Sequence, residues 1–432
     1  MSEPPLQFPG ERSKPELLAP AGSLEKCKIA FLYGADAVYV GTDKYSLRAY
    51  ARNLSDENLA EAVCLGHALG RKLYVTVNTF ARESDLDALP SFLRYLQDIQ
   101  VDGVIISDPG VLSLARECCP HVPIHLSTQS NTTNSLSIRF WQWFGVRRIN
   151  LARELTFSEI ERISAASSVE LEMFVHGAMC MSYSGRCLLS SFLNQRSANQ
   201  GLCSQPCRWS YRLVEEKRPG QFFPISEDSH GTYIFNSKDL CLLEDLGRLM
   251  SLGIRAFKIE GRMKGALYLA TVLRTYRRAI DEFWDSPQTF APREEWVRDL
   301  KCVSHRPYTS GFLFPDRLDS ITEAFNSAAP SQTHTLAGII RPHPETAVFH
   351  GLSPGNQPGR PICMEVRSRL VGGAQIEFLF PDGRTISHIL RGFRSLRGVT
   401  LQVAHPNTWI QFEAPFATFP LQVVRCMQRQ TE

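Results

Sequence analysis

The feature that most constrains the fold is a regular alternation of short apolar runs with helical patterns, from residue 14 to about residue 265. The runs have the length and β-branched content of buried strands, and this alternation indicates a parallel sheet with crossover helices. About eight units fit a closed barrel better than an open sheet. No GxGxxG motif follows the first run, which argues against a dinucleotide-binding fold. The sequence therefore predicts an α/β fold, a TIM-like (β/α)8 barrel with elaborated loops. The candidate strands are residues 16–18, 37–40, 72–77, 103–106, 124–127, 148–151, 171–175, 233–235 and 257–259.

Two segments depart from this rhythm. Residues 178–232 are too long for an ordinary strand–helix loop, so we interpret them as a cysteine-rich insertion over the barrel mouth. After a linker near residues 326–334, the chain alternates apolar and polar positions between turns up to about residue 430, which predicts a small C-terminal β-barrel. The predicted domains are thus a catalytic barrel over residues 14–325 and a small β-barrel domain over residues 336–430.

The charge of the chain does not by itself indicate a nucleic-acid partner, because the formal net charge is only +3. From residue 336 onward, ten arginines and no lysine stand against six acidic residues, a local net charge of +4. Arg391, Arg394 and Arg397 cluster around Phe393. Such a module suits contact with a phosphate backbone. A packing domain with a solvated basic face explains the same pattern equally well.

The sequence shows no run of about eighteen apolar residues, so no membrane span is expected. Its first stretch, MSEPPLQFPGERSKPE, lacks the apolar core of a signal peptide. We therefore expect a cytoplasmic protein without a membrane partner, whose oligomeric state the sequence does not indicate. Twelve cysteines in such a chain favour metal binding or ordinary burial over disulfide bonds.

Five of the cysteines gather within about sixty residues and define a candidate metal site. Three loops from one barrel face would bring their thiolates together, and four thiolates suit either tetrahedral zinc or an iron–sulfur cluster. Structural zinc sites prefer paired CxxC motifs, which are absent here, so the spacing favours a cluster. Zinc, or no metal at all, remains an alternative at this point. The five are Cys180, Cys187, Cys203, Cys207 and Cys241.

Candidate catalytic residues are the polar side chains that follow predicted strands, because the carboxyl ends of barrel strands meet at one face. His176 titrates near neutrality when unperturbed and could transfer a proton. Glu260 could bind a substrate or pair with a neighbouring cation such as Arg262. Lys238 and Asp239 end another apparent strand. A turn, a helix cap or a histidine satisfied by the backbone would explain each of these residues equally well.

Basic and aromatic residues interleave with the cysteines and suggest a binding surface. Arg186, Arg208 and Trp209 lie in the insertion, and Arg153 follows another strand. Arginine offers a bidentate fork to carboxylate or phosphate, and an aromatic ring offers a stacking face to a base. These residues could hold RNA or a small carboxylate metabolite. No HExxH helix or GxSxG turn occurs, so the residues provide no recognisable proteolytic centre.

Several long motifs resemble those of the collagenase-like peptidase family U32. The stretch EMFVHGAMCMSYSGRCLLS, from Glu172 to Ser190, is similar to the signature of that family. The segments ELLAPAGS, GADAVYVG, NSKDLC and FKIEGRMK, which begin at residues 16, 34, 236 and 257, are similar to its other motifs. The resemblance covers roughly residues 15–315, and the tail resembles the small β-barrel that ends some members.

The resemblance is strongest to the branch of the family that hydroxylates tRNA. It implies insertion of a hydroxyl at carbon 5 of the wobble uridine, independent of O₂ and dependent on prephenate as a co-substrate. It also implies a [4Fe–4S] cluster on four cysteines, three of them Cys180, Cys187 and Cys203, with Cys241 preferred to Cys207 as the fourth. Three alternatives remain: hydroxylation of another RNA, a collagenase-like peptidase, and an RNA-binding module whose metal is purely structural.

Overall fold

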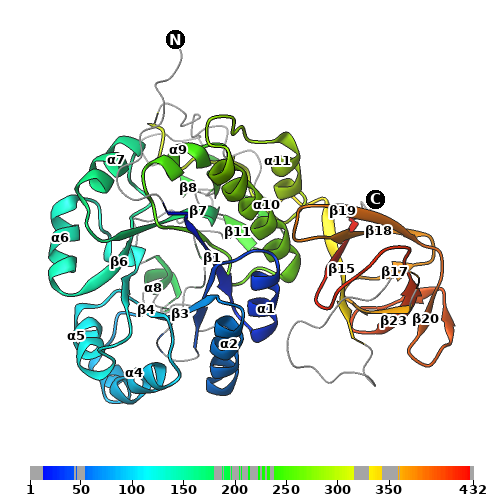
Figure 1. Cartoon of the computed structure of the whole chain (residues 1–432), viewed down its shortest axis with the longest axis horizontal. Helices are drawn as coiled ribbons and strands as arrows, with labels where there is room; N and C mark the ends of the chain where they lie inside the picture. Colours follow the sequence, from blue (N-terminus) through cyan, green and yellow to red (C-terminus); the bar gives the residue numbers. More distant parts are fainter. Residues whose placement is uncertain are drawn as a thin grey trace, which may run out of the picture.

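The computed structural model describes most of the chain, in two domains joined through a buried interface (Figure 1). The described residues are 13–42, 45, 54–179, 187, 189–194, 196, 204, 206, 213–214, 222–223, 226–228, 231–233, 238–315, 330–342, 359 and 361–428. Of the helices within these ranges, none combines the length and apolar character that a membrane span needs.

Eight parallel strands close into a barrel, which confirms the predicted fold class. They follow the chain order around the barrel, and the last strand, β13, pairs with both β7 and β1 to complete the ring. A closed ring of parallel strands has no exposed edge. The barrel strands are β1 (Glu16–Ala21), β2 (Ala37–Gly41), β3 (Lys72–Val77), β4 (Gly103–Ile106), β5 (Ile124–Leu126), β6 (Val146–Asn150), β7 (Glu170–Ala178) and β13 (Ala256–Ile259).

Helices surround the barrel, and several of them begin at capping residues that the sequence places directly after strands or loops. Ser23, Ser55, Asp108, Asn134 and Thr156 each accept a hydrogen bond from a backbone N–H of the first helical turn. The helices are α1 (Leu24–Leu32), α2 (Asp56–Ala68), α3 (Glu83–Leu86), α4 (Leu89–Asp98), α5 (Pro109–Cys118), the 3₁₀ turn η1 (Thr128–Ser130), α6 (Ser135–Trp143), α7 (Phe157–Ala166), α8 (Leu189–Asn194), α9 (Leu246–Ser251), α10 (Ala266–Asp285) and α11 (Glu294–Lys301).

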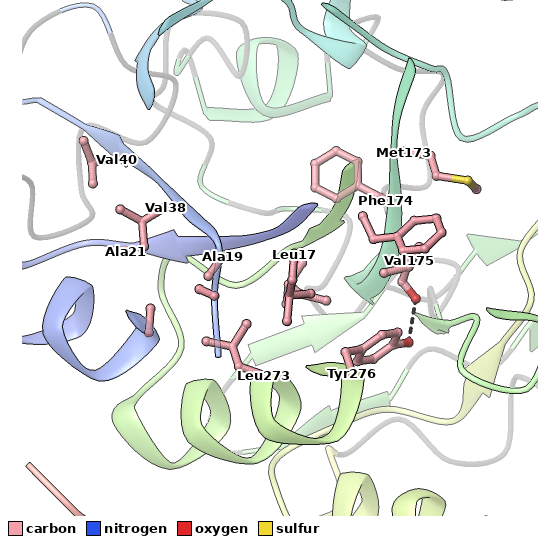
Figure 2. Close-up of a cluster of buried hydrophobic side chains, with 14 of the residues drawn as sticks. Leu17, Ala19, Ala21, Val38, Val40, Met173, Phe174, Val175, Leu273 and Tyr276 are labelled. Carbon is pink, nitrogen blue, oxygen red and sulfur yellow. Dashed lines mark hydrogen bonds between the residues drawn. The ribbon is translucent and has the colours of Figure 1, made fainter. Parts of the chain in front are cut away.

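The main hydrophobic core lies between the strands and these helices. Figure 2 shows Leu17 and Ala19 of β1 beside Leu273 and Tyr276 of α10, all of them fully buried. The Tyr276 hydroxyl donates a hydrogen bond of 2.9 Å to the carbonyl oxygen of Val175 in β7. Helix α10 therefore packs on β1 and is hydrogen-bonded to β7, the strand that leads into the predicted site.

One predicted barrel strand is wrong. Residues 233–235 were expected in the barrel, but β11 (Gly231–Tyr233) pairs antiparallel with β10 (Ser226–Asp228) in a separate hairpin, and residues 234–237 lie outside the described ranges. A short β-branched and aromatic run has the same pattern in a hairpin as in a barrel. Two further short strands, β8 (Leu213–Val214) and β9 (Phe222–Phe223), pair with each other. Two more, β12 (Asp239–Cys241) and β14 (Tyr308–Thr309), extend the barrel sheet beside β7.

The C-terminal residues form an antiparallel sheet that curves into a half-barrel, which confirms the predicted all-β domain. Its strand order is β19-β18-β24-β15-β16-β23-β20-β21, and it encloses its own core around Met364, Phe378 and Phe412. Residues 326–329 of the predicted linker lie outside the described residues, and the predicted boundary stays a prediction. The strands are β15 (His334–Arg341), β16 (Pro361–Val366), β17 (Leu370–Val371), β18 (Ala374–Leu379), β19 (Thr385–Leu390), β20 (Phe393–Ser395), β21 (Thr400–Leu401), β22 (Val403–Ala404), β23 (Trp409–Glu413) and β24 (Val423–Met427).

Tyr33, just after α1, links the two domains with one buried hydroxyl. It donates to the carbonyl oxygen of Leu379 at 3.0 Å and accepts from the backbone nitrogen of Val423 at 2.9 Å. Changing Tyr33 to Phe would leave both backbone groups buried without this partner, so we expect the free energy of unfolding to fall by about 2–4 kcal/mol. Denaturant unfolding tests this result. The control is Tyr95→Phe, because the Tyr95 hydroxyl bonds to Asp56 at an exposed position and its loss should cost less than about 1 kcal/mol.

Candidate functional site

The interior of the barrel is unusually polar. Barrels of this type are normally filled by layers of bulky branched apolar side chains. Here a small apolar cluster that includes Leu18 and Tyr39 shares the interior with buried charged residues. Four charged side chains with little or no exposure lie at inward positions and come from four different strands. They are Glu16, Arg148, Glu172 and Lys258.

Lys258 lies inside the barrel on β13 and is held by a buried carboxylate. Its Nζ atom donates to Glu172 Oε1 at 2.7 Å, and it lies 4.5 Å from the centre of the Tyr39 ring. Asn150 donates to the same carboxylate oxygen through Nδ2 at 2.8 Å. Glu172 Oε2 and Asn150 Oδ1 have no hydrogen-bond partner among the described residues. A buried ammonium group with two unused acceptors beside it is suited to hold water or a small polar ligand.

Arg148 extends this network toward the amino-terminal end of the barrel. Its Nη1 atom donates to Glu16 Oε1 at 2.6 Å and lies 3.7 Å from Glu172 Oε2. Tyr74 donates to Glu16 at 2.9 Å. Burial alone would raise the pKa of Glu16, but the adjacent Arg148 holds it below its usual value. Burial, reinforced by Arg148 and Lys258, lowers the pKa of His125 well below its ordinary value, so this imidazole is neutral.

The lowered pKa of Glu16 predicts a pH-dependent stability. A carboxylate whose pKa is lower in the folded state stabilises the fold above its unfolded pKa, and this contribution is lost as pH falls through the folded value. The wild type should therefore lose stability relative to Glu16→Gln as the pH falls below about 4.3, the ordinary pKa of glutamate. Urea unfolding of both proteins between neutral pH and about pH 3 tests this. A difference that stays constant over the whole range would contradict it.

Polar residues after three neighbouring strands meet at the carboxyl end of the barrel. Asn78 Nδ2 donates to Gln129 Oε1 at 2.8 Å, and Ser107 donates to the same oxygen at 3.1 Å. Asn78 Oδ1 is buried and has no hydrogen-bond partner among the described residues. The rim therefore presents an amide acceptor that a ligand N–H group could use.

Glu260 and Arg262 follow β13 at the same end, which agrees with their predicted placement. Glu260 Oε2 lies 3.4 Å from the Tyr39 hydroxyl, and Arg262 donates to Thr76 Oγ1 at 3.2 Å. Gly177 has a φ of +109° and packs so closely that a Cβ atom there would lie 2.4 Å from the Glu260 carbonyl oxygen. Only glycine tolerates both conditions, so Gly177 sets the approach of β7 to Glu260. The catalytic roles of Glu260 and Arg262 stay predictions.

His176 lies at the end of β7 but is enclosed by tyrosines. The ring centres of Tyr268, Tyr276 and Tyr308 lie 5.4–5.9 Å from its own. Burial, with Lys264 nearby, lowers the pKa of His176 to about 3. An imidazole that is neutral throughout the physiological range is poorly suited to donate a proton. This environment favours a positioning role, and the predicted proton transfer stays a prediction.

The other described candidates take part in local structure. Asp239 in β12 is buried and accepts from the backbone nitrogen of Arg306 at 3.1 Å. Lys238, directly before it, is partly exposed. Arg153 was predicted to contact RNA or a co-substrate. It donates to the Ala178 carbonyl oxygen at 3.0 Å and lies over the Phe174 ring. These contacts fix the last residue of β7, from which the chain continues to the first predicted cluster cysteine.

Two of the five predicted cluster ligands, Cys187 and Cys241, belong to the described residues. Cys180, Cys203 and Cys207 lie outside them, as do Arg186, Arg208 and Trp209. Cys241 pairs with His176 across the β12–β7 ladder, and its sulfur lies 3.8 Å from the Tyr276 hydroxyl. Burial raises the pKa of this thiol to about 11, so it is protonated when no metal is bound.

Hydrogen bonds among described residues bring the neighbourhoods of two predicted ligands, Cys187 and Cys203, together. Ser204, which follows Cys203, donates from its backbone nitrogen to Ser190 Oγ at 3.0 Å. Ser190 belongs to α8, which begins two residues after Cys187. The described chain is therefore compatible with a common site for Cys187 and Cys203. Within the described ranges, no group of three or more His, Cys, Asp or Glu residues is arranged to hold a metal ion.

The fold and the site together define a two-domain (β/α)8-barrel protein with a charged interior and a polar mouth near the candidate ligand Cys241. The family model of peptidase family U32 matches residues 22–322, and the chain belongs to this family.

Three relatives show the range of names within that family. The chain is 35% identical over 413 residues to tRNA hydroxylation protein P1 of Bacillus subtilis (strain 168), covering 95% of this chain and 94% of that protein. It is 35% identical over 431 residues to tRNA hydroxylation protein P of Escherichia coli (strain K12), with 90% and 91% covered. It is 34% identical over 329 residues to a collagenase of Porphyromonas gingivalis (strain ATCC BAA-308 / W83), with 73% and 78% covered.

Proposed function

We propose that this protein is an enzyme that hydroxylates a uridine base of tRNA. The observation that carries the proposal is similarity over nearly the full length, both domains included, to relatives named for tRNA hydroxylation. We further propose that the target is carbon 5 of the wobble uridine, that the reaction is independent of O₂, and that prephenate is the co-substrate. These finer points rest on the motifs from residue 172 to residue 190 and from residue 257 to residue 264.

The proposed cofactor is a [4Fe–4S] cluster bound by Cys180, Cys187, Cys203 and Cys241, with Cys207 as the alternative fourth ligand. The cluster would supply one-electron redox chemistry at the barrel mouth. Cys241 fits this role as a partly buried thiol, because the charge of bound iron would replace the proton that the free thiol retains. The Tyr276 hydroxyl, which donates its proton to Val175, would remain a polar neighbour 3.8 Å from the sulfur.

The mouth offers groups that suit a flipped base and an acidic metabolite. A base that reacts must leave its stack and be read along its Watson–Crick edge. Asn78 Oδ1, which lacks a partner among the described residues, is suited to accept from the N3–H of uracil. Lys258 in the barrel interior, paired with Glu172, and Arg262 at the carboxyl end of the barrel carry positive charge, which suits a carboxylate.

A collagenase-like activity, suggested by the name of one relative, receives less support from the described residues. A cysteine peptidase needs a thiol of lowered pKa beside a histidine base. The pKa of Cys241 is raised to about 11 and its hydrogen-bond partner is Tyr276. His176 stays neutral within its tyrosine cage. Gelatin cleavage by the purified protein, lost on changing Cys180 to Ser, would reverse this preference.

The proposal is tested by mass spectrometry of tRNA nucleosides from a strain that lacks this protein. We expect 5-hydroxyuridine derivatives to disappear and to return when the wild-type protein is supplied. Cys241→Ser should fail to restore them, whereas Cys426→Ser, a change in the C-terminal sheet, should restore them fully. Unchanged nucleosides in the deletion strain would end the tRNA assignment.

The cofactor and the co-substrate need separate measurements. Protein purified without air should contain iron and acid-labile sulfide in equal amounts and absorb visible light through thiolate-to-iron charge transfer. Zinc in place of iron would contradict the cluster. Reconstituted hydroxylation should require prephenate, and an equal rate without it, or with an unrelated dicarboxylate, would contradict the co-substrate.

A further inference from the structure

Helix α6 presents a large apolar surface to solvent, although it is part of the barrel wall. Trp143 is 84% exposed, Leu136 65% and Phe140 50%, and Phe144 directly after the helix is 37% exposed. The described α6 buries only Ile138. Exposed apolar groups of this size, gathered on one helix, mark an interaction site more often than a solvated face.

These side chains share one face of the helix. Leu136, Phe140 and Trp143 follow each other at spacings of four and three residues, which brings them onto one side of an α-helix. The ring centres of Phe140 and Phe144 lie 4.8 Å apart, and those of Trp143 and Phe144 lie 5.9 Å apart. The rings therefore pack against one another outside the core and form a continuous aromatic surface.

Arginines accompany this surface. Arg139 lies on the same face of α6, between Leu136 and Trp143 in the helical spacing, and Arg147 is exposed on β6 directly after the helix. Arg116 of α5 is exposed and lies beside the turn at Gly145, 3.9 Å from where a Cβ atom would be. None of the three side chains makes a hydrogen bond or an ion pair with another described residue.

The charge around α6 favours a polyanion over a second copy of this chain. Residues 109–150 contain four arginines and a single acidic residue, Glu117. The neighbouring helix α7 adds Glu159, which accepts from Thr156 at the start of the helix, and Glu161, which Arg162 follows directly. A two-fold dimer through this face would bring the exposed arginines close to their own copies with few carboxylates to compensate, and like-charge contacts disfavour such an interface. A nucleic acid supplies both phosphates for the arginines and bases for the rings.

The position of α6 connects this surface to the barrel mouth. The helix begins six residues after Gln129, which lies on the rim, and its nine residues extend about 13 Å down the outside of the barrel. Figure 1 shows α6 on the edge of the barrel that faces away from the C-terminal domain. An RNA strand whose target base enters the barrel mouth could thus continue along α6.

We infer that the α6 surface, formed by Leu136, Arg139, Phe140, Trp143, Phe144, Arg147 and Arg116, binds unpaired nucleotides that flank the target base. The rings would stack on bases and the arginines would contact phosphates. This inference rests on the proposed function for the identity of the RNA, but its test does not depend on the hydroxylation reaction.

The test measures binding of an unmodified tRNA transcript to the holoprotein by fluorescence anisotropy at several salt concentrations. Trp143→Ala should weaken binding by about five- to a hundredfold, the range for loss of one base–aromatic stack. Arg139→Glu/Arg147→Glu should weaken it at least tenfold and reduce the slope of log affinity against log salt by about 1.4, since each lost single-strand phosphate contact contributes about 0.7. Met427→Ala and Arg298→Glu are exposed controls on the C-terminal sheet and on α11, and should bind as the wild type does.

A photo-crosslinking amino acid at position 143 identifies the occupant directly. Crosslinks to the transcript, at nucleotides next to the modified uridine, support the inference. Crosslinked protein dimers, or self-association in sedimentation experiments that Trp143→Ala abolishes, would overturn it in favour of a second copy. Wild-type affinity in the α6 variants would also overturn it. If a deletion strain retains normal nucleosides while the α6 variants lose tRNA binding, the proposed function fails and the α6 surface stands.

Discussion

Replacing Lys258 with methionine is expected to lower the free energy of unfolding by about 3–5 kcal/mol, because it leaves the Glu172 carboxylate buried without its principal partner. Both side chains are almost completely inaccessible, and the Nζ–Oε1 distance is 2.7 Å. Asn150 continues to donate to Glu172, but Arg148 is 3.7 Å away and is already engaged by Glu16. Chemical denaturation of the two proteins at neutral pH measures this difference.

A double variant separates the buried pair from other effects of the substitution. Lys258→Met/Glu172→Gln removes both charges, so it should recover at least about 2 kcal/mol relative to Lys258→Met alone. Lys28→Met is the matched control, because Lys28 pairs with Glu61 at 3.0 Å on the surface and its loss should cost about 0–1 kcal/mol. Equal effects of the Lys258 and Lys28 substitutions would show that the interior pair contributes no more than a surface pair.

The same double variant also separates folding from function. We propose that the positive charge of Lys258 helps to bind a carboxylate co-substrate. If so, tRNA hydroxylation by the double variant should stay below the wild-type level even where stability returns. Nucleoside analysis after expression of the double variant in the deletion strain measures this. Full recovery of product together with stability would make Lys258 a structural residue only.

The barrel could be predicted from the sequence because its signal is local. Each strand is a short apolar run, and residues such as Ser55, Asp108 and Thr156 mark helix starts within a few positions of their true place. The run at residues 233–235 was misassigned because a hairpin strand and a barrel strand look alike over three residues. Their difference lies in pairing partners, which are distant in the chain.

The charged interior was not predicted, although the sequence contained a signal for it. Glu16, Arg148, Glu172 and Lys258 are charged residues at the inward positions of otherwise apolar strands, and a charge in such a run needs a buried partner. The partners depend on barrel closure: β13 lies between β1 and β7 only once the ring forms, which brings Lys258 to Glu172 across 86 residues of sequence. No local pattern encodes that pairing.

The sequence indicates which candidate residues end or follow strands, but it does not indicate what surrounds them. His176, Glu260 and Arg262 end or follow parallel strands and therefore lie at one end of the barrel, where the structure also brings Asn78 and Gln129 together. The sequence did not indicate that Tyr268 and Tyr276 from α10 and Tyr308 from β14 would enclose His176 and hold it neutral. This environment depends on tertiary packing between elements that lie about a hundred residues from His176 in the sequence.

The second large effect is expected where the domains meet. Asp299 of α11 accepts from Arg274 of α10 and, at 3.0 Å, from Arg425 of β24. Arg274 is fully buried and also donates to the Arg384 carbonyl oxygen at 3.2 Å in the C-terminal domain. The single carboxylate of Asp299 therefore lies between two buried guanidinium groups from different domains. Changing Asp299 to Asn keeps the shape of the side chain but leaves the two cations facing each other.

We expect Asp299→Asn to lower the free energy of unfolding by about 3–5 kcal/mol, because an uncompensated buried charge costs more than the pair contributes. Arg274→Met added to Asp299→Asn should recover part of the loss, since Arg425 keeps its 2.7 Å bond to Glu377. The control is Asp382→Asn, whose carboxylate pairs with Arg384 at an exposed turn and should contribute about 0–1 kcal/mol. Denaturant unfolding of the four proteins decides the matter. If Asp299→Asn unfolds together with the wild type, apolar contacts such as those around Leu379 and Val423 hold the domains together without help from this charge.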